Sequence, residues 1–274
     1  MKRRKFLLLA ILAAASAMPA AGQTQGPAQA AASIPDFSRF WRHQSLPGLE
    51  PLASGPTSLT NRSRRNGVSD YNQLVGDYKN PILQPWAAAI VKRWAEETHA
   101  GHPPAHAHAL CYPTSLPGVM TLHNAYQFLQ TPEKVTIIIA NQTQARHIYL
   151  NVPHSKHVTP SWYGESVGHY EGDTLVVDTV GINERGWIDA YGTPTTKQLH
   201  LVEKWTRLDF KTLRYEITID DPGAYTAPFT TGMLMTYAPG REMFEFVCQD
   251  GNLGGELMIG GGNSKIDRSS PIVP

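Results

Sequence analysis

Short runs rich in β-branched and aromatic residues alternate with turn residues from residue 127 onward. Such runs predict strands, and the turns at 171–173, 210–212 and 239–241 predict hairpins between consecutive strands. The predicted strands span 134–141, 146–152, 174–181, 199–209, 213–221, 230–238 and 242–250. Consecutive hairpins favour an antiparallel meander. We therefore predict a mainly β fold closed into a barrel or half-barrel, with a two-sheet sandwich as the alternative.

One helix is predicted at 82–98, where Trp86, Ile90 and Trp94 recur every four residues with alanines between them. Residues 36–80 are rich in Pro, Gly, Ser and Asn and show no sustained periodicity. We predict that they form irregular chain around the core, with anchors at Phe37, Phe40 and Trp41. Residues 36–252 are thus expected to form a single β-rich domain.

The first 22 residues have the pattern of an export signal, with four basic residues at 2–5 followed by an apolar run at 6–17. Cleavage is predicted near Gln23, and the Arg3-Arg4 pair fits a twin-arginine signal as well as an ordinary secretory one. A disordered linker is predicted at 23–35 and a flexible Gly-rich tail at 253–274. The mature protein is therefore predicted to be periplasmic or secreted.

Composition narrows the possible partners and predicts a disulfide. The full chain has 24 basic and 23 acidic residues, so loss of the signal leaves a net charge of −3. No basic patch is present, which argues against a nucleic-acid partner, and no stretch after the signal is long and apolar enough to predict a membrane span. The two cysteines, Cys111 and Cys248, predict a disulfide in an exported protein, with Cys111 as a nucleophile as the alternative.

A set of motifs runs in order through the β-rich region. The motifs are CYPTSLPG (111–118), FLQTPEKVTIII (128–139), RHIYLN (146–151), PSWYGESVGHYEGDTLVVDT (160–179), LVEKWTRLD (201–209), EITIDDPGAYTAPF (216–229) and FEFVCQDGN (244–252). Over residues 105–252 the chain resembles a large family of exported bacterial proteins that carry a pattern close to GxWEGDTLVVDT. The resemblance implies an exported, β-rich, single-domain protein. The chain departs from the family at Tyr170, where Trp is usual, and at 151–154, where Asn-Val-Pro-His replaces an Asp-Gly-Arg-x-His-Pro turn.

The histidine run at 99–108 is a possible metal site. His99, His102, His106 and His108 supply four imidazoles, and three convergent ones would hold Zn²⁺ with an open position. Their spacing matches no standard zinc site, so a solvated linker without metal is the preferred interpretation. A metal-dependent hydrolase that uses the run remains the second alternative function.

Two histidines and two carboxylates are the candidate catalytic groups. His154 follows Pro153 in a loop, and His169 precedes the Glu171–Asp173 turn. Asp178 lies inside a predicted strand with apolar residues on both faces. We expect it to be shielded from water, so that it needs either a raised pKa or a partner, with Arg146, Arg207 or a Trp N–H as the structural candidates. Glu203 shares a face with Leu201 and Trp205, and we expect it to point into a cavity with Arg207 as its partner.

These groups predict a periplasmic enzyme that moves protons on a small, partly apolar organic molecule, as a lyase, isomerase or hydratase does. No organic cofactor is expected. His154 and His169 would act as base or acid, and Asp178 and Glu203 as orienting groups. The predicted substrate-binding residues are the aromatic side chains Trp162, Tyr163, Tyr170 and Trp205. The first alternative is a non-catalytic periplasmic small-molecule-binding protein. Convergence of His169, Asp178 and Glu203 would favour the enzyme.

Overall fold

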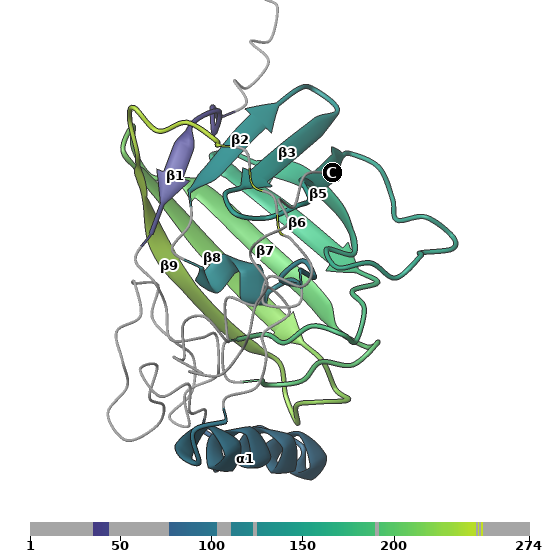
Figure 1. Cartoon of the computed structure of the whole chain (residues 1–274). Helices are drawn as coiled ribbons and strands as arrows, with labels where there is room; N and C mark the ends of the chain where they lie inside the picture. The colour runs from purple at the N-terminus through teal and green to yellow at the C-terminus, as the bar shows by residue number, and fades with distance from the viewer. Residues whose placement is uncertain are drawn as a thin grey trace, which may run out of the picture. The chain divides into compact units, whose positions relative to one another are not determined.

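A closed β-barrel forms the body of the molecule (Figure 1). The computed structural model describes residues 35–43, 77–102, 111–122, 125–189, 192–244, 246 and 248. The predicted export signal, most of the predicted linker and the predicted tail lie outside these residues. Within them, nine strands are ordered as they occur along the chain, and β1 closes the barrel by pairing with β9. The predicted mainly β barrel is confirmed.

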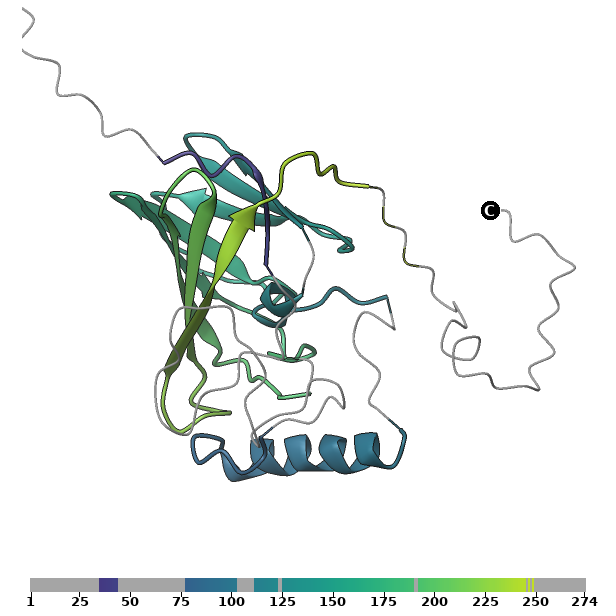
Figure 2. The ribbon, with the colours of Figure 1, turned by 90° about the vertical axis from the view of Figure 1, so that its left-hand side faces the viewer.

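Eight of the nine neighbouring strand pairs are antiparallel, and β4 and β5 are parallel. The strands are β1 (Phe40–Arg42), β2 (Tyr126–Gln130), β3 (Lys134–Ile139), β4 (Arg146–Leu150), β5 (Glu165–Glu171), β6 (Thr174–Val180), β7 (His200–Arg207), β8 (Thr212–Asp220) and β9 (Phe229–Tyr237). Buried and more exposed residues alternate along most of them, so that one face of each strand lines the barrel interior. Figure 2 shows β9 and the strands beside it curving around that interior.

Three strands were not predicted, and one predicted strand does not form. β5 carries few apolar residues and contains Gly168, where an added Cβ would lie 2.8 Å from the Val176 carbonyl oxygen. A glycine therefore permits close packing at a position where the hydrophobic pattern is weak. The described residues of 242–250 carry no strand. Because β9 already pairs with β8 and β1, the closed barrel leaves no edge for a further strand.

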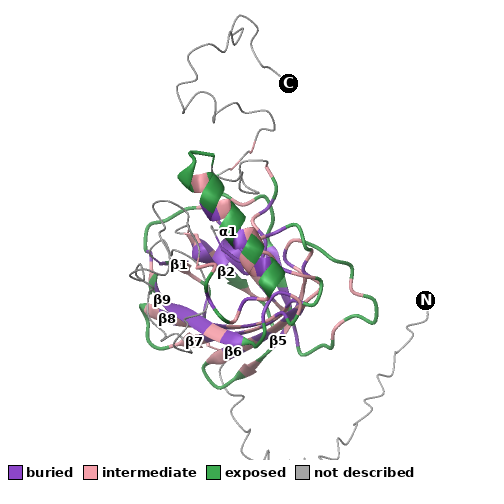
Figure 3. Cartoon of the chain, turned by 90° about the horizontal axis from the view of Figure 1, so that it is seen from below, coloured by how far each residue is buried: buried purple, intermediate pink, exposed green. Residues whose placement is uncertain are grey.

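The predicted helix is present as α1 (Pro85–His99), with Pro at its first position. Its buried stripe is Ala87, Val91 and Ala95, one residue beyond the predicted Trp86–Ile90–Trp94 stripe. The helix is tied to the segment after β8, because the Trp86 indole donates to the Gly223 carbonyl at 2.8 Å. Figure 3 shows how little of α1 is buried compared with the strands.

A short 3-10 helix, η2 (Gly118–Thr121), is entirely buried. No helix within the described ranges has the length and apolar character needed to cross a membrane.

A fully buried ion pair crosses the barrel interior from β4 to β7. The Arg146 guanidinium donates to both oxygens of Glu203, with Nη1 2.8 Å from Oε1. Its Nη2 also donates to the hydroxyls of Ser166 and Thr179, each at 3.1 Å. The Tyr215 hydroxyl donates to Glu203 Oε1 at 2.9 Å. This interior network therefore joins five consecutive strands, β4 to β8.

Burial and charge act in opposite directions on this network. Burial by itself lowers the pKa of Arg146, but the adjacent Glu203 carboxylate outweighs it, so the pKa is raised overall. Burial and the same carboxylate both raise the pKa of Tyr215, which therefore stays a neutral donor. A buried charge that is paired and hydrogen-bonded in this way is tolerated, whereas the same charge without its partner is strongly destabilising.

We expect Arg146→Met to lower the free energy of unfolding by about 3–5 kcal/mol, because it leaves the Glu203 carboxylate buried without a counter-charge. Urea denaturation at neutral pH measures the change. The matched control is Arg214→Met, which removes a partly exposed arginine on the outer face of β8 and should cost less than about 1 kcal/mol. The double variant Arg146→Met/Glu203→Leu should recover most of the loss. Equal effects of the two single arginine variants would contradict the assignment.

Candidate functional site

Titratable side chains gather on the outer face of β5, β6 and β7. Glu165, Asp178 and His200 occupy outward positions on these three strands, and His154 reaches them from the segment between β4 and β5. We call these four residues the outer cluster. Asp178 is at its centre: its Oδ1 lies 2.8 Å from His154 Nε2, and its Oδ2 lies 2.8 Å from His200 Nε2. Nδ1 of His154 lies 3.0 Å from Glu165 Oε1.

Hydrogen bonds set the ionisation of the two carboxylates. The pKa of Asp178 is lowered: partial burial raises it, but hydrogen bonds from His154 and His200 outweigh this. The pKa of Glu165 is also lowered, chiefly because it accepts from the Ser155 hydroxyl at 2.5 Å and from the Ser155 backbone N–H at 2.7 Å. Both carboxylates are therefore ionised at neutral pH.

The two imidazoles of the outer cluster differ in what they can do. Both ring nitrogens of His154 contact carboxylates, and although burial lowers its pKa, these hydrogen bonds raise it overall. Both nitrogens of His154 are thus engaged, and it has no free nitrogen to present to a ligand. His200 uses only Nε2, and among the described residues nothing hydrogen-bonds to its Nδ1. With a side chain 39% exposed, His200 can present this nitrogen to a small molecule.

Valines surround the outer cluster. Asp178 pairs in register with Val167 on β5 and with Val202 on β7, and Val176 and Val180 flank it on β6. All four valines are half-buried. The polar centre therefore sits in an apolar frame, which suits a molecule with one reactive polar group and an apolar body.

The structure corrects three expectations about the carboxylates. Asp178 is not shielded: its side chain is 41% exposed, and its partners are His154 and His200. Glu203 does point into the barrel, but its partner is Arg146. Arg207 lies four residues from Glu203, about 13 Å along an extended strand. It instead donates to the backbone carbonyl oxygens of Asp209 and Phe210.

The predicted catalytic residues do not form one group. His154 and Asp178 meet, but Glu203 lies inside the barrel whereas Asp178 lies outside it. His169 is on the outer face, two residues further along β5 than Val167, and its Nε2 lies 3.0 Å from Glu171. The convergence of His169, Asp178 and Glu203 that would have favoured catalysis is absent. His200 replaces His169 as the second imidazole on Asp178.

The four predicted substrate-binding aromatics lie in different environments. Trp205 is buried in the core between Phe128 and Tyr215, with ring centroids 5.1 and 4.2 Å away. Tyr163 is also buried, and Tyr170 accepts a hydrogen bond from Gln130 at 2.9 Å. Trp162 stacks on Tyr112 with ring centroids 5.5 Å apart. These contacts identify Trp205 as a core residue and not as part of an open cleft.

A Gly-x-Ser-x-Gly sequence at 164–168 does not form a serine nucleophile. In hydrolases this motif exposes the serine on a strand-to-helix turn. Here Ser166 lies in β5, where it is buried, accepts from Arg146 and shares a hydrogen bond with the Thr179 hydroxyl. It belongs to the interior network.

No group of three or more His, Cys, Asp or Glu side chains within the described ranges is arranged to hold a metal ion. In the histidine run, His99 is the last residue of α1, and the His102 N–H donates to the Glu97 carbonyl at 2.8 Å. His106 and His108 lie outside the described residues. The metal-hydrolase alternative therefore stays a prediction.

His200 is the residue of the outer cluster that the sequence analysis did not select. It lies on the face of β7 opposite Glu203. Aligning the predicted strands so that Asp178 pairs with Val202 brings His200 diagonally beside Asp178. The register of β6 and β7 is therefore the feature that could have identified His200 as a partner of Asp178.

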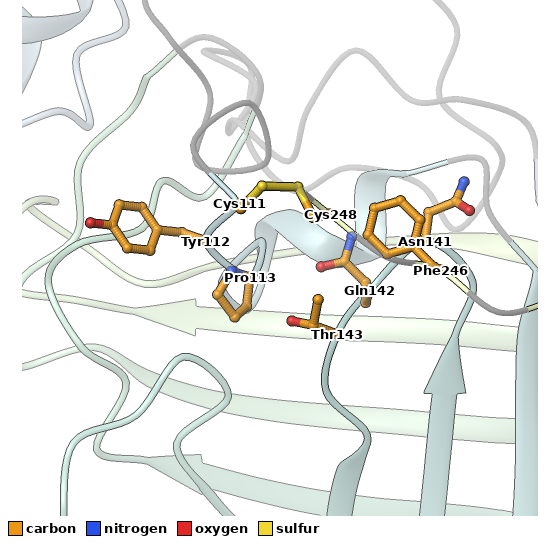
Figure 4. Close-up of a pocket in the computed structure, with 8 residues that line it drawn as sticks. All are labelled: Cys111, Tyr112, Pro113, Asn141, Gln142, Thr143, Phe246 and Cys248. Atoms are coloured by element: carbon orange, nitrogen blue, oxygen red, sulfur yellow. A yellow bond between two sulfur atoms is a disulfide. The ribbon is translucent and has the colours of Figure 1, made fainter. Parts of the chain in front are cut away.

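The predicted disulfide joins Cys111 and Cys248, whose Cα atoms are 5.5 Å apart. It borders a surface hollow of about 160 Å³, which Figure 4 shows with Gln142 and Phe246 beside the two sulfur atoms. That volume includes solvent above the surface, and the hollow encloses no space of its own. We therefore do not regard it as a ligand site, and the bonded state of Cys111 excludes its use as a free nucleophile in this structure.

Comparisons with protein families, with curated proteins and with solved structures found no match. The resemblance to exported bacterial proteins therefore stays a prediction. Any argument about function rests on the geometry of the outer cluster.

We expect the double variant Cys111→Ser/Cys248→Ser to be less stable, because the disulfide closes a loop with a sequence separation of 137 residues. The chain-entropy model puts the loss at about 5 kcal/mol at most. Thermal and urea denaturation measure it, and reduction of the unmodified protein with a phosphine should give a similar decrease. Unchanged denaturation midpoints in both experiments would contradict this role.

Proposed function

We propose that the protein is an exported enzyme that transfers protons on a small organic molecule, with the outer cluster as its active site. One observation carries the proposal: His200 bonds to Asp178 through Nε2 and keeps Nδ1 without a partner among the described residues. A neutral imidazole whose second nitrogen donates to a carboxylate is the arrangement that general bases use. The reaction class is that of a lyase, an isomerase or a hydratase.

The outer cluster can take a proton from the substrate and return it at a different position. Nδ1 of His200 would take a proton from the substrate, and the resulting imidazolium would be stabilised by the Asp178 carboxylate 2.8 Å away. The same proton can return to another atom of the substrate, which gives an isomerisation, or to a leaving group, which gives an elimination. Neither outcome needs a second protein base.

His154 and Glu165 would position Asp178 and not react themselves. Both nitrogens of His154 are engaged, so it cannot accept a substrate proton without breaking a contact. Its hydrogen bond fixes one oxygen of Asp178, and the other oxygen is left for His200. Val167, Val176 and Val202 would contact the apolar part of the substrate.

The disulfide supports the proposal that the protein acts outside the cytoplasm. Structural disulfides persist in oxidising compartments and are rare in the cytosol. The Cys111–Cys248 bond is therefore consistent with the export signal predicted from residues 1–22.

The test uses 5-nitrobenzisoxazole, a small aromatic molecule whose ring opens when a base removes its carbon-bound proton, with a coloured product. We expect the full-length protein to accelerate this reaction and His200→Gln to lower the rate about 10²–10⁴-fold. Asp178→Asn should also lower the rate, because the imidazolium loses its counter-charge. Absorbance of the product measures the rate at fixed pH.

The matched control is His147→Gln, which removes an exposed outer-face histidine on β4 that contacts Thr136. It should leave the rate unchanged. A loss with His169→Gln but not with His200→Gln would support the original assignment and overturn this one. Saturable binding of the probe without ring opening would instead favour the non-catalytic binding protein.

A further inference from the structure

The chain between the parallel strands β4 and β5 crosses the outer face of the barrel. Its start is fixed where the Asn151 N–H donates to the Gly168 carbonyl at 2.8 Å. Its end is fixed where the Ser161 N–H donates to the Gly181 carbonyl at 3.0 Å, beside the bridge from Ser161 to Ile182. Both ends are therefore held by backbone hydrogen bonds.

The middle of this crossover, residues 152–160, is held differently. Among the described residues, its hydrogen bonds to the barrel come from His154 and Ser155, and their acceptors are Glu165 and Asp178. Val158 adds apolar contact with the backbone at Gly181, where an added Cβ would lie 2.3 Å from its Cγ1. The attachment of this segment therefore depends on one imidazole, one serine and two carboxylates.

The His154 contacts require a particular protonation state. Its two nitrogens face carboxylate oxygens at 3.0 and 2.8 Å, and an ionised carboxylate can only accept. Both nitrogens donate only when the ring is doubly protonated. A neutral ring keeps one of the two bonds and turns a lone pair toward the other carboxylate, which repels it.

We propose that residues 152–160 form a pH-sensitive lid on the outer cluster, held most firmly against β5 and β6 when His154 is protonated and loosened when it loses that proton, while the Ser155 bonds to Glu165 remain. The lid goes beyond the proposed function and does not depend on it, since the contacts form whether or not the cluster is catalytic. If the cluster is catalytic, release leaves Asp178 bound to His200 alone.

The direction of the pH effect follows from the groups that face His154. They are Glu165 from β5 and Asp178 from β6, with His200 of β7 competing for Asp178 and Ser155 sharing Glu165. On the crossover itself, Lys156 and His157 are exposed.

The pKa of His154 is raised above its ordinary value of 6.5, so the His154 contribution to the attachment is complete below pH 6.5 and is lost as the pH rises through the higher value. The pKa values of Asp178 and Glu165 are lowered from 3.8 and 4.5. The attachment is therefore lost a second time only in stronger acid, below those values.

The experiment is amide hydrogen exchange of the full-length protein between pH 5.5 and 9, with each rate divided by the intrinsic rate at that pH. Within residues 152–160, the backbone N–H that the structure shows in a hydrogen bond is that of Ser155, so the protection of this segment is read at the Ser155 amide. We expect this protection to fall about tenfold as the pH rises through the pKa of His154. Protection of the β5–β6 hairpin, residues 165–180, should stay constant and serves as the internal reference.

Two variants separate His154 from its neighbours. His154→Gln should show low protection of 152–160 that no longer depends on pH, whereas His157→Gln should behave as the unmodified protein does. The same pH profile in both variants, or pH-independent protection in the unmodified protein, would overturn the proposal. If His154→Gln does not fold, the pH profile of the unmodified protein and the Asp178→Asn variant test the proposal instead. In Asp178→Asn we expect reduced protection of residues 152–160 at pH 6.

Discussion

The Arg146–Glu203 ion pair is the interaction on which the rest of the barrel depends. It lies where solvent cannot reach, it joins strands that are not neighbours, and Ser166, Thr179 and Tyr215 complete its hydrogen bonds. A shifted register on β4 or β7 would leave one of the two charges buried without a partner, which costs far more than a lost apolar contact. The network therefore selects one arrangement of strands among those that the hydrophobic pattern alone would allow.

The inner and outer faces of the same strands carry charges of different character. On β6 and β7, Glu203 faces inward and is fixed by an arginine whose charge does not change at physiological pH. Asp178 and His200 face outward and are partly exposed. Each contact of Asp178 in the outer cluster joins its carboxylate to an imidazole, from His154 or His200. A histidine changes its charge near neutral pH, so the outer contacts can change while the inner ones hold the barrel. Successive residues of a strand point to opposite faces. The same strands therefore carry contacts that stabilise the barrel on the inside and contacts that respond to pH on the outside.

The sequence predicted those parts of the structure that depend on local pattern. The helix at 85–99, six of the strands, the turn at Gly172 and the disulfide were all predicted. β1, β2 and β5 were missed. In β5 the core-facing positions are serine and glycine, which carry no hydrophobic signal.

The candidate site was predicted only in part, because it depends on strand register and on which face is inward. β6 has apolar residues on both faces, so the pattern could not show that Asp178 points outward, whereas the Leu201–Glu203–Trp205 face of β7 was correctly predicted to point inward. The partners of Asp178 and Glu203 come from other strands or from a loop. No spacing along a single strand could have identified them.

The number of strands requires a parallel pair of neighbours in the ring, and β4 and β5 form it. Strands that alternate in direction close into a ring with antiparallel neighbours throughout only if their number is even. This ring has nine, so one pair of neighbours has to run in the same direction. A parallel pair cannot be joined by a tight turn, and the chain needs a long return path. In this barrel the parallel pair is β4 and β5, so residues 151–164, and His154 with them, form the return path across the outside of the barrel. A barrel of eight or ten strictly alternating strands would need no parallel pair and no return segment of this kind.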